Sequence, residues 1–526
     1  MAIDCWTVLS SLLVGALLAA WQWWRQYSTR FARLGLPYEP PVPLLGNLLG
    51  AAFSRRSQHD IVVDLYNKFQ PHAYGGLYGF AESMIMIRDP EIIRTITVKD
   101  FDHFTDHANF IESEKANPIQ QRMLLVLKGK EWHDMRTTLS PAFTSMKMKN
   151  MFVLMTEIGQ QMVDYLWKET AVYKVPSNKD DVLTLEMKDF FTRITNDVIA
   201  TSAFGVKVDS LSDPENLFYS MGRELSTIHM MTAICYKLFP KLMLFLGIPF
   251  FSEKAMEYFR SVVSETIETR EKQGIVRPDM LHLLMQARRG ELTSEEGEKD
   301  GAATSNARRL TEHDVAAQAI IFFFAGFDTV STVLTFCSYL LAEHEEVQRR
   351  LQQEVDDVMK KSGGQPSYEQ VMGCQYLDMV ISETLRMYPP APFLDRECVR
   401  AYSLPATDSC PGVELRPRDA IWIPVHGIHN DPNYFPQPDT FRPERFTPEN
   451  KQLIEPFTYF PFGSGPRICI AQRFALMEIK IVMLYLMSQF SVEVVDKTPV
   501  PIKLDPSNSV SVSIKGGAWL GIRQRS

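Results

Sequence analysis

The sequence predicts one large, mainly α-helical domain with small β-sheets, preceded by a membrane anchor at the N-terminus. Most windows between residues 110 and 390 show the 3.6-residue periodicity of helices, and short apolar runs bounded by turn residues flank that region. The first 25 residues are almost free of charge. A chain of 526 residues often holds three or four domains, but no repeat is visible and one large fold is compatible with this length.

Composition and charge exclude several classes of protein. With 45% hydrophobic and 22% charged residues the chain can bury a large core, so disorder, collagen-like repeats and coiled coil are excluded as global descriptions. The 55 basic and 63 acidic residues give a net charge of −8, which argues against a nucleic-acid-binding protein. Seven scattered cysteines without a C-x-x-C pair argue against a disulfide scaffold and favour a reducing, cytosol-facing location.

Residues 1–25 are predicted to form a single membrane anchor. From Cys5 to Trp24 the chain carries no charge, and this length matches the ~20 residues that cross a ~30 Å hydrocarbon core. Tryptophans at the end of the run are typical of a membrane interface. A cleaved signal peptide is the alternative, but no basic residue precedes the apolar run, and leucines occupy the −3 positions of the candidate cleavage sites.

The residues that follow the anchor predict its orientation. Arg25, Arg30 and Arg33 occur without an intervening acidic residue, so the positive-inside rule places the rest of the chain in the cytoplasm. Residues 26–50 contain four prolines, which prevent a continuous helix and predict a stiff hinge. We expect this hinge to separate the anchor mechanically from a domain of residues 51–526.

Strands are expected on both sides of the helical region, and a polar insertion at residues 288–309 is expected to be an exposed loop. The last strand-like segment is broken at Gly516-Gly517, which is typical of a hairpin. The strand-like segments are residues 74–94, 420–425, 491–495 and 510–522.

Two further apolar stretches need an explanation. Residues 228–251 are interrupted by two lysines and a proline, so we expect surface helices that touch a membrane or the core rather than a span. Residues 315–342 contain one charge, Asp328, and are typical of either a membrane span or the central helix of a large core. Inside a membrane Asp328 would cost ~2.5–3.5 kcal/mol, so its presence indicates a function.

The segment FPFGSGPRICI, from Phe460 to Ile470, carries the clearest chemical signal. Its glycines allow the backbone to approach a flat ligand closely, and the cation two residues before Cys469 favours a thiolate. A dinucleotide-binding loop is the competing interpretation, but Ile468 occupies the position of its third glycine. An isolated buried cysteine is usually inert, so the importance of Cys469 depends on these neighbours.

Phe462, Gly465, Arg467 and Cys469 match the pattern F-x-x-G-x-R-x-C, and here the chain resembles the cytochrome P-450 family of haem-thiolate monooxygenases. The resemblance covers essentially the whole chain. Its further motifs are WHDMR with Trp132 and Arg136, AGFDT with Ala325, Gly326, Asp328 and Thr329, ETLR with Glu383 and Arg386, and PERF with Pro443, Glu444, Arg445 and Phe446.

Two positions depart from the family pattern, and three segments resemble one branch of it. Ala471 replaces the usual glycine two residues after the cysteine, and Val330 replaces a common Thr or Ser. The first change is expected to affect packing at most, and neither removes a chemical group. The segments FDHFTDH, RPDMLHLLMQAR and GGAWLGIRQR resemble insect microsomal members of the third clan, especially its ninth family, which is associated with detoxification.

The resemblance implies a cofactor and a role for each motif residue. Haem b, iron protoporphyrin IX, would be bound with Cys469 as the axial thiolate ligand of its iron. Asp328 and Thr329 would relay protons to dioxygen, which makes the long helix core rather than membrane. Glu383, Arg386 and Arg445 would form a buried structural triad. The residues expected to hold the haem are Arg467, Arg136, Trp132, Arg396, Phe462 and Gly465.

Substrate contacts are implied by position alone, in an apolar pocket for a lipophilic compound. Phe322, Phe323 and Phe324 cannot all face one side of a helix, so at least one of them is core. The candidate contacts are Phe110, Ile111, Phe324, Ala325, Ala391, Phe393, Ser509 and Val510.

The implied activity is the oxidation of lipophilic compounds, such as insecticides, plant toxins, endogenous lipids or hormones, at the endoplasmic reticulum membrane with O2 and electrons from NADPH. The chain has no flavin or nicotinamide motif, so it requires a separate NADPH-dependent flavoprotein reductase, with cytochrome b5 as a second donor. The expected docking face for the reductase carries Lys128, Lys130, Lys147, Lys149 and Arg473.

Three alternatives are weighed against this activity. A reductase-independent haem-thiolate isomerase or dehydratase would not need the Asp328-Thr329 pair, which is intact. A non-catalytic haem sensor would not consume NADPH in the presence of a reductase. A two-span membrane receptor or transporter would explain the two hydrophobic stretches but not the separate motifs.

Overall fold

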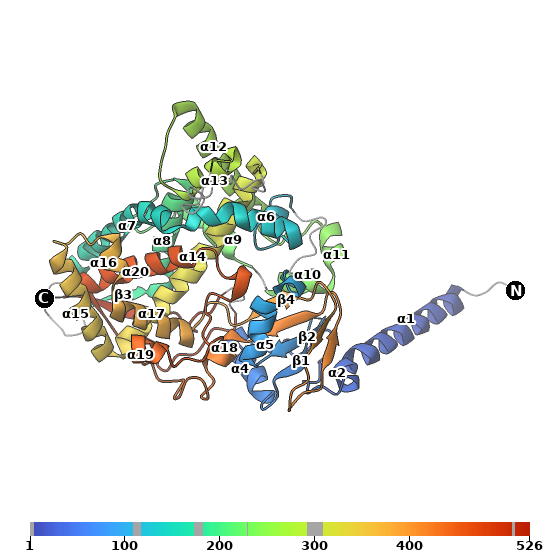
Figure 1. The fold of residues 1–526 in the computed structure, drawn as a ribbon. Helices are drawn as coiled ribbons and strands as arrows, with labels where there is room; N and C mark the ends of the chain where they lie inside the picture. Colours follow the sequence, from blue (N-terminus) through green and yellow to red (C-terminus); the bar gives the residue numbers. More distant parts are fainter. Residues whose placement is uncertain are drawn as a thin grey trace.

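The apolar segment that contains Asp328 folds into one long helix, α14 (Glu312–Glu343), and other helices pack around it (Figure 1). The computed structural model describes residues 5–80, 82–108, 117–172, 182–228, 230–291, 309–507 and 511–525. Within these ranges α14 is the one helix long and apolar enough to cross a membrane, but 67% of its most apolar window is buried inside the protein. The expectation of a central core helix is therefore confirmed.

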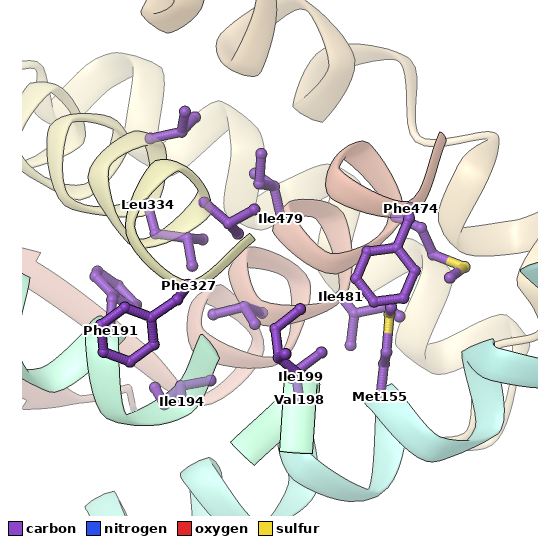
Figure 2. Packing of buried hydrophobic residues seen from close by; sticks show 14 of the residues in the cluster. Met155, Phe191, Ile194, Val198, Ile199, Phe327, Leu334, Phe474, Ile479 and Ile481 are labelled. Atoms are coloured by element: carbon purple, nitrogen blue, oxygen red, sulfur yellow. The ribbon is translucent and has the colours of Figure 1, made fainter. Parts of the chain in front are cut away.

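The interior is one large hydrophobic cluster built on α14. Helices α8 (Met187–Ile199), α12 (Glu253–Gln273), α13 (Met280–Arg289), α17 (Gln375–Met387) and α20 (Gln472–Gln489) contact it directly. Figure 2 shows part of this cluster, in which Phe327 of α14 lies near Phe191 and Ile194 of α8. Phe323 is fully buried against the ring of Phe259, so it is the member of the Phe322–Phe324 run that belongs to the core.

The other helices cover this core and the sheets. Three short helical turns matter for the site, namely η1 (Thr95–Lys99), η7 (Pro443–Phe446) and η8 (Gly465–Arg467). The remaining α-helices are α1 (Cys5–Ser28), α2 (Arg30–Arg33), α3 (Leu49–Ala52), α4 (Gln58–Lys68), α5 (Pro90–Arg94), α6 (Gly129–Leu139), α7 (Ser145–Ala171), α9 (Leu217–Ser226), α10 (Met230–Leu238), α11 (Pro240–Phe245), α15 (Glu345–Lys361), α16 (Tyr368–Met372), α18 (Val425–His429) and α19 (Pro448–Lys451).

Three small sheets lie at the edges of the helical body, as the sequence predicted. The largest has the order β1-β2-β7-β4, with β2 parallel to β7 and the other pairs antiparallel. The second has the order β3-β9-β8, and the third is the pair β5-β6. The strands are β1 (Tyr74–Gly79), β2 (Glu82–Ile87), β3 (Leu183–Glu186), β4 (Leu394–Glu397), β5 (Tyr402–Leu404), β6 (Val413–Leu415), β7 (Ala420–Ile423), β8 (Phe490–Glu493) and β9 (Trp519–Gln524).

The expected hairpin around Gly516-Gly517 is wrong. Residues 503–505 pair with residues 513–515 through Asp505 N to Ser513 O and Lys515 N to Lys503 O, both 2.8 Å. After the glycines the chain enters β9, which pairs with β8 and β3 instead of the preceding segment. The local glycine pair gives a turn, but the partners of a strand depend on contacts far away in the sequence.

The residues that join α1 to the body are not a free hinge, which corrects the expected mechanical separation. Phe31 and Leu36 are buried in a second hydrophobic cluster with β1 and β2. Arg30 forms a two-pronged ion pair with Asp419, with N–O distances of 2.8 and 2.7 Å. Tyr38 bridges to Gly76 of β1. The prolines therefore shape a segment that is held on the first sheet.

Residues 230–245 form the surface helices α10 and α11, as the interrupted apolar pattern predicted. Their outer face is unusually apolar for a protein surface. The exposed side chains are Met231, Phe239, Leu242, Phe245, Leu246 and Ile248.

Candidate functional site

The cysteine loop is a compact turn that leads into α20. The N–H of Cys469 donates to the carbonyl of Phe462 at 2.9 Å, and the N–H of Ile468 donates to the carbonyl of Gly465 at the same distance. Between them η8 forms one tight turn. These bonds fix the position of the Cys469 backbone before the helix begins.

Gly465 is required because protein backbone, rather than a ligand, approaches it. Its φ is +72°, and a Cβ at this position would lie 1.8 Å from the carbonyl oxygen of Thr97 in η1. Ala471, in contrast, has a φ of −96°, which any residue adopts. The replacement of the usual glycine by Ala471 therefore introduces no backbone strain.

Cys469 combines an accessible surface with a largely desolvated thiol. The residue is exposed, and desolvation by the surrounding protein raises the pKa of the thiol. Arg136 acts against desolvation and lowers the pKa of the thiol. The sequence spacing had indicated Arg467 as the cation that favours the thiolate. The structure shows that this cation is Arg136 instead.

Arg467 is buried above an aromatic ring and held by backbone carbonyls. Its Nε donates to Thr105 O at 2.8 Å and its Nη2 to Leu127 O at 3.0 Å. The guanidinium carbon lies 4.0 Å from the centre of the Trp132 ring, a cation–π contact. Desolvation lowers the pKa of Arg467 to about 9, although Asp106 acts in the opposite direction.

Arg396 and Arg136 add two more cations to the same region. Both act on Arg467 electrostatically and lower its pKa. Arg396 on β4 is fully buried, and its Nε has no hydrogen-bond partner. Arg136 on α6 is half-buried, and within the described ranges its guanidinium has no carboxylate partner. Desolvation lowers the pKa of each of these guanidinium groups.

The carboxylates near these arginines are already engaged. Asp395 accepts from the backbone N–H of Ala108 at 2.6 Å and lies 3.0 Å from His107 Nδ1. Asp106 accepts from the backbone N–H of Gly129 at 2.8 Å and lies 3.6 Å from Arg467. Two buried arginines and the half-buried Arg136 therefore lie near two carboxylates that are already occupied, and such a site favours an anion with several oxygen acceptors.

These residues fit haem. Its two propionates would supply the missing carboxylates, and Cys469 would supply the sulfur ligand. The structure thus brings together Cys469, Arg467, Arg136, Trp132 and Arg396, as the motifs had predicted. Phe462 lies in the same loop, partly buried against the main hydrophobic cluster.

The middle of α14 presents two different faces. Ala325 is exposed although the helix around it is buried, and Thr329 one turn later is half-buried. The Thr329 hydroxyl donates to the carbonyl of Ala325 at 2.6 Å. Asp328 points to another side, where its Oδ1 forms an ion pair with Lys188 of α8 at 2.8 Å. Sequence reasoning missed Lys188, because no local signal relates residues 140 positions apart.

Glu383, Arg386 and Arg445 form one buried ion-paired group. Glu383 lies 2.8 and 3.0 Å from Arg386, and 3.0 Å from the Nε of Arg445. The two arginines also donate to the carbonyls of His429, Pro436, Gln437 and Pro438. The group thus joins α17 to η7 and to the chain that leads toward the cysteine loop, which is a structural role.

The candidate substrate residues are only partly brought together. Phe324 packs edge-on against Phe251 with ring centres 5.4 Å apart. Phe393 stacks on Trp422 of β7 at 4.0 Å, and Ala391 beside it is exposed. Val330, which stands where a hydroxyl is common, is buried. The other candidates, Phe110, Ile111, Ser509 and Val510, lie outside the described residues.

Comparison with known proteins agrees with this site. The sequence model described as Cytochrome P450 matches residues 36–520. Cytochrome P450 9e2 of Blattella germanica is 45% identical over 99% of this chain and 98% of its own length. Probable cytochrome P450 9f2 of Drosophila melanogaster is 39% identical over 99% of both chains. Cytochrome P450 6k1 of Blattella germanica is 36% identical over 98% of this chain and 96% of its own.

The fold and these similarities define a haem-thiolate protein that catalyses monooxygenation. The chain belongs to the cytochrome P450 family. The similarity to insect members of the ninth family confirms the placement that the three sequence segments predicted.

The close approach at Gly465 gives a test of the loop. Gly465→Ala should lower the thermal stability and haem content of the protein, because the new methyl group meets the fixed carbonyl of Thr97 and the positive φ costs a further ~1–2 kcal/mol. Absorption of the purified protein and thermal unfolding measure both effects. Ala471→Gly is the control, for which we expect a change of about 1 kcal/mol or less. Normal haem content in Gly465→Ala would contradict the loop geometry.

Proposed function

We propose that this monooxygenase uses haem b, ligated by Cys469, to oxidise lipophilic compounds at the endoplasmic reticulum membrane. The observation that carries the proposal is the accessible Cys469 beside Arg136, with the buried Arg467 and Arg396 close by and few carboxylates to balance these cations. Insecticides, plant toxins, endogenous lipids and hormones are the substrate classes that fit an apolar pocket. The half-buried Phe324 and the exposed Ala325 are its proposed lining on α14.

When bound, thiolate-ligated haem would supply the activation of dioxygen. The residues of the chain would orient the cofactor and deliver protons. Arg467, Arg396 and Arg136 would bind the propionates and fix the orientation of the ring. Thr329 presents its hydroxyl on the accessible face of α14, with its own proton donated to Ala325 O. Asp328 supplies a carboxylate next to it in the chain. We assign these two residues to proton delivery.

The ligand assignment is tested by Cys469→Ala. This variant should lose the red-shifted Soret band of the reduced carbonyl complex, because the band requires a thiolate on the iron. Cys337→Ala is the matched control, since Cys337 is fully buried in α14 and burial raises its pKa to about 12. Survival of the band in Cys469→Ala, or its loss in the control alone, would show that another residue is the ligand.

The proton-delivery assignment is tested by Thr329→Val. The hydroxyl is removed at nearly constant volume, so product formed per NADPH should fall by about tenfold while hydrogen peroxide rises. Thr335→Val is the control, because Thr335 also donates to a helix carbonyl, that of Ser331, but is buried two turns away. Equal coupling in the two variants would remove Thr329 from the proposed proton delivery.

Membrane attachment is proposed for α1 and for the apolar face of α10 and α11. In Figure 1 α1 projects away from the body, and its described side chains from Ser11 to Trp23 are exposed. The exposed apolar side chains of α1 support its attachment to lipid. The positive charges of Arg25, Arg30 and Arg33 keep the body on the cytoplasmic side in this proposal.

Deletion of residues 1–25 should lower membrane affinity and leave haem content intact. The deletion ends before Tyr27, whose hydroxyl donates to the carbonyl of Glu82 at 2.9 Å and so belongs to the body. Combining the deletion with Leu242→Asp and Phe245→Asp should release the remaining bound protein, as measured by flotation with vesicles. Unchanged flotation after all three changes would contradict the proposed attachment surfaces.

Reductase docking is proposed on the side of the protein near the start of α20, with a revised set of cations. Three of the expected lysines already have carboxylate partners: Lys128 pairs with Glu397, Lys130 with Asp134 and Lys149 with Glu369. Lys147 and Arg473 have no carboxylate partner within the described ranges, and Arg473 reaches Ser145 in the first turn of α7. The positive charges of Lys147 and Arg473 are therefore not neutralised by a described carboxylate and can attract an acidic partner.

The combined Lys147→Glu and Arg473→Glu change should slow reduction by the NADPH-dependent reductase about tenfold at low salt and flatten its salt dependence. Stopped-flow reduction under carbon monoxide measures the rate, first with the reductase and then with cytochrome b5. The combined Arg349→Glu and Lys360→Glu change on α15 is the control, because it alters the total charge by the same amount. An equal effect of the control, or no effect of the pair, would place the docking surface elsewhere.

A further inference from the structure

The contact between α8 and α14 contains a polar seam, made of Lys188 and Thr195 from α8 with Ser331 and Thr332 from α14. Thr195 donates to the carbonyl of Phe327 at 2.9 Å. Lys188 and Thr195 are seven residues apart and therefore lie on the same side of their helix. The seam is unusual in this interface, which is otherwise built from buried apolar side chains.

The ammonium group of Lys188 is surrounded by oxygen acceptors. Its Nζ lies 2.8 Å from Asp328 Oδ1 and 2.8 Å from the carbonyl oxygen of the same residue. It also lies 2.7 Å from Ser331 Oγ and 2.8 Å from Thr332 Oγ1. An ammonium has three N–H donors, so four acceptors at these distances leave none of its hydrogens free. The position of Nζ is thus fixed on α14.

This contact sets the direction of the Asp328 carboxylate. Asp328 and Thr329 are consecutive in a helix and point about 100° apart. Thr329 faces the accessible side with Ala325, whereas Asp328 reaches toward α8. Asp328 Oδ2 is buried and makes no hydrogen bond by geometry, although Ser511 lies near enough to lower the pKa of the carboxyl.

We propose that Lys188 is a positioning residue for proton delivery, which keeps the Asp328 carboxylate charged and turned toward α8. This inference rests on the proposed role of Asp328 and Thr329. The polar contacts of Lys188 are with Asp328, Ser331 and Thr332 of α14. Lys188 acts through Asp328, whose charge and orientation it determines.

The charge of Asp328 reflects two opposing effects. Desolvation is the larger single effect and raises the pKa, while Lys188 and Ser511 lower it, and the net pKa is below the usual value. Lys188 from α8 is the charged group that faces Asp328 among the described residues, and Ser511 is the neighbouring polar group from the C-terminal segment. Removal of the lysine charge leaves desolvation dominant, so the pKa of Asp328 should then rise above its usual value.

Lys188 also determines how the stability of the fold depends on pH. In the unaltered protein the lowered pKa stabilises the fold above the unfolded value of about 3.9, and this contribution is lost only as the pH falls below that value. In Lys188→Met the pKa of Asp328 in the folded state is expected to be raised. The Asp328 carboxyl then keeps a proton in the folded state that it releases in the unfolded state. Stability is then lost as the pH rises from the unfolded pKa through the folded one, so the deficit should grow between about pH 5 and 8.

The experiment measures thermal unfolding of the haem-loaded protein from pH 5 to 8, together with product formed per NADPH. Lys188→Met should lower Tm by an amount that grows by about 2 °C or more over this range, and should lower coupling at least about threefold. Lys188→Arg should keep both near normal because it restores the charge. The control is Lys480→Met, since buried Lys480 of α20 pairs at 3.0 Å with Asp378, whose side chain is exposed and should stay charged without the lysine, so its Tm deficit should not grow with pH.

The variants separate the possible failures. If Lys188→Met lowers Tm equally at every pH, Lys188 has a packing role and the inference is overturned. The same conclusion follows if Lys188→Met has the same pH-dependent effect on Tm in an Asp328→Asn background. Normal coupling in Lys188→Met, with reduced coupling in Asp328→Asn, would also overturn it. Normal coupling in Asp328→Asn would instead refute the proposed function of Asp328, while the Tm result would still decide whether Lys188 holds its charge.

Discussion

Two buried arginine side chains and one half-buried arginine lie near Cys469, and the proposed site depends on this concentration of positive charge. Arg467, Arg396 and Arg136 come from the cysteine loop, from β4 and from α6. Burial of a cation without a full partner costs several kcal/mol, which favours an anionic group beside these arginines. Burial also raises the pKa of the Cys469 thiol, so a ligand that stabilises the thiolate would offset this effect. Haem would meet both requirements at once.

The rest of the fold holds these groups in place. The Glu383 triad fixes the irregular segment before the cysteine loop through backbone carbonyls rather than through side chains. Breaking one partner of such a fully buried group is strongly destabilising, which explains why it acts as a fixed support and not as a catalytic acid. Helix α14, which α17 contacts directly, carries apolar side chains of the same core and the Thr329 hydroxyl. The buried triad and the residues proposed for proton delivery therefore belong to neighbouring helices of one core.

The sequence predicted what a local pattern determines. The cysteine loop, the central helix and three of the strand regions follow from composition, glycines and periodicity, and the family motifs supplied the arginines. What it missed depends on contacts between distant segments. Lys188 is one charge in an ordinary amphipathic helix until α8 packs on Asp328. Gly465 looks like a ligand-facing glycine until Thr97 lies against it. The prolines before residue 50 predict a linker, but Phe31 and Arg30 attach that segment to a sheet.

In the proposed site, the three arginines near Cys469 bind the carboxylates of the cofactor. The most direct test compares the binding of iron protoporphyrin IX with that of its dimethyl ester. Both have the same ring and iron, but the ester has no negative charge to offer Arg467, Arg396 and Arg136. We expect haem-depleted protein to bind the ester at least about 100-fold more weakly than the free acid, because charge-assisted hydrogen bonds are lost. Equal affinity for the two compounds would contradict the assignment of the arginine cluster as the propionate site.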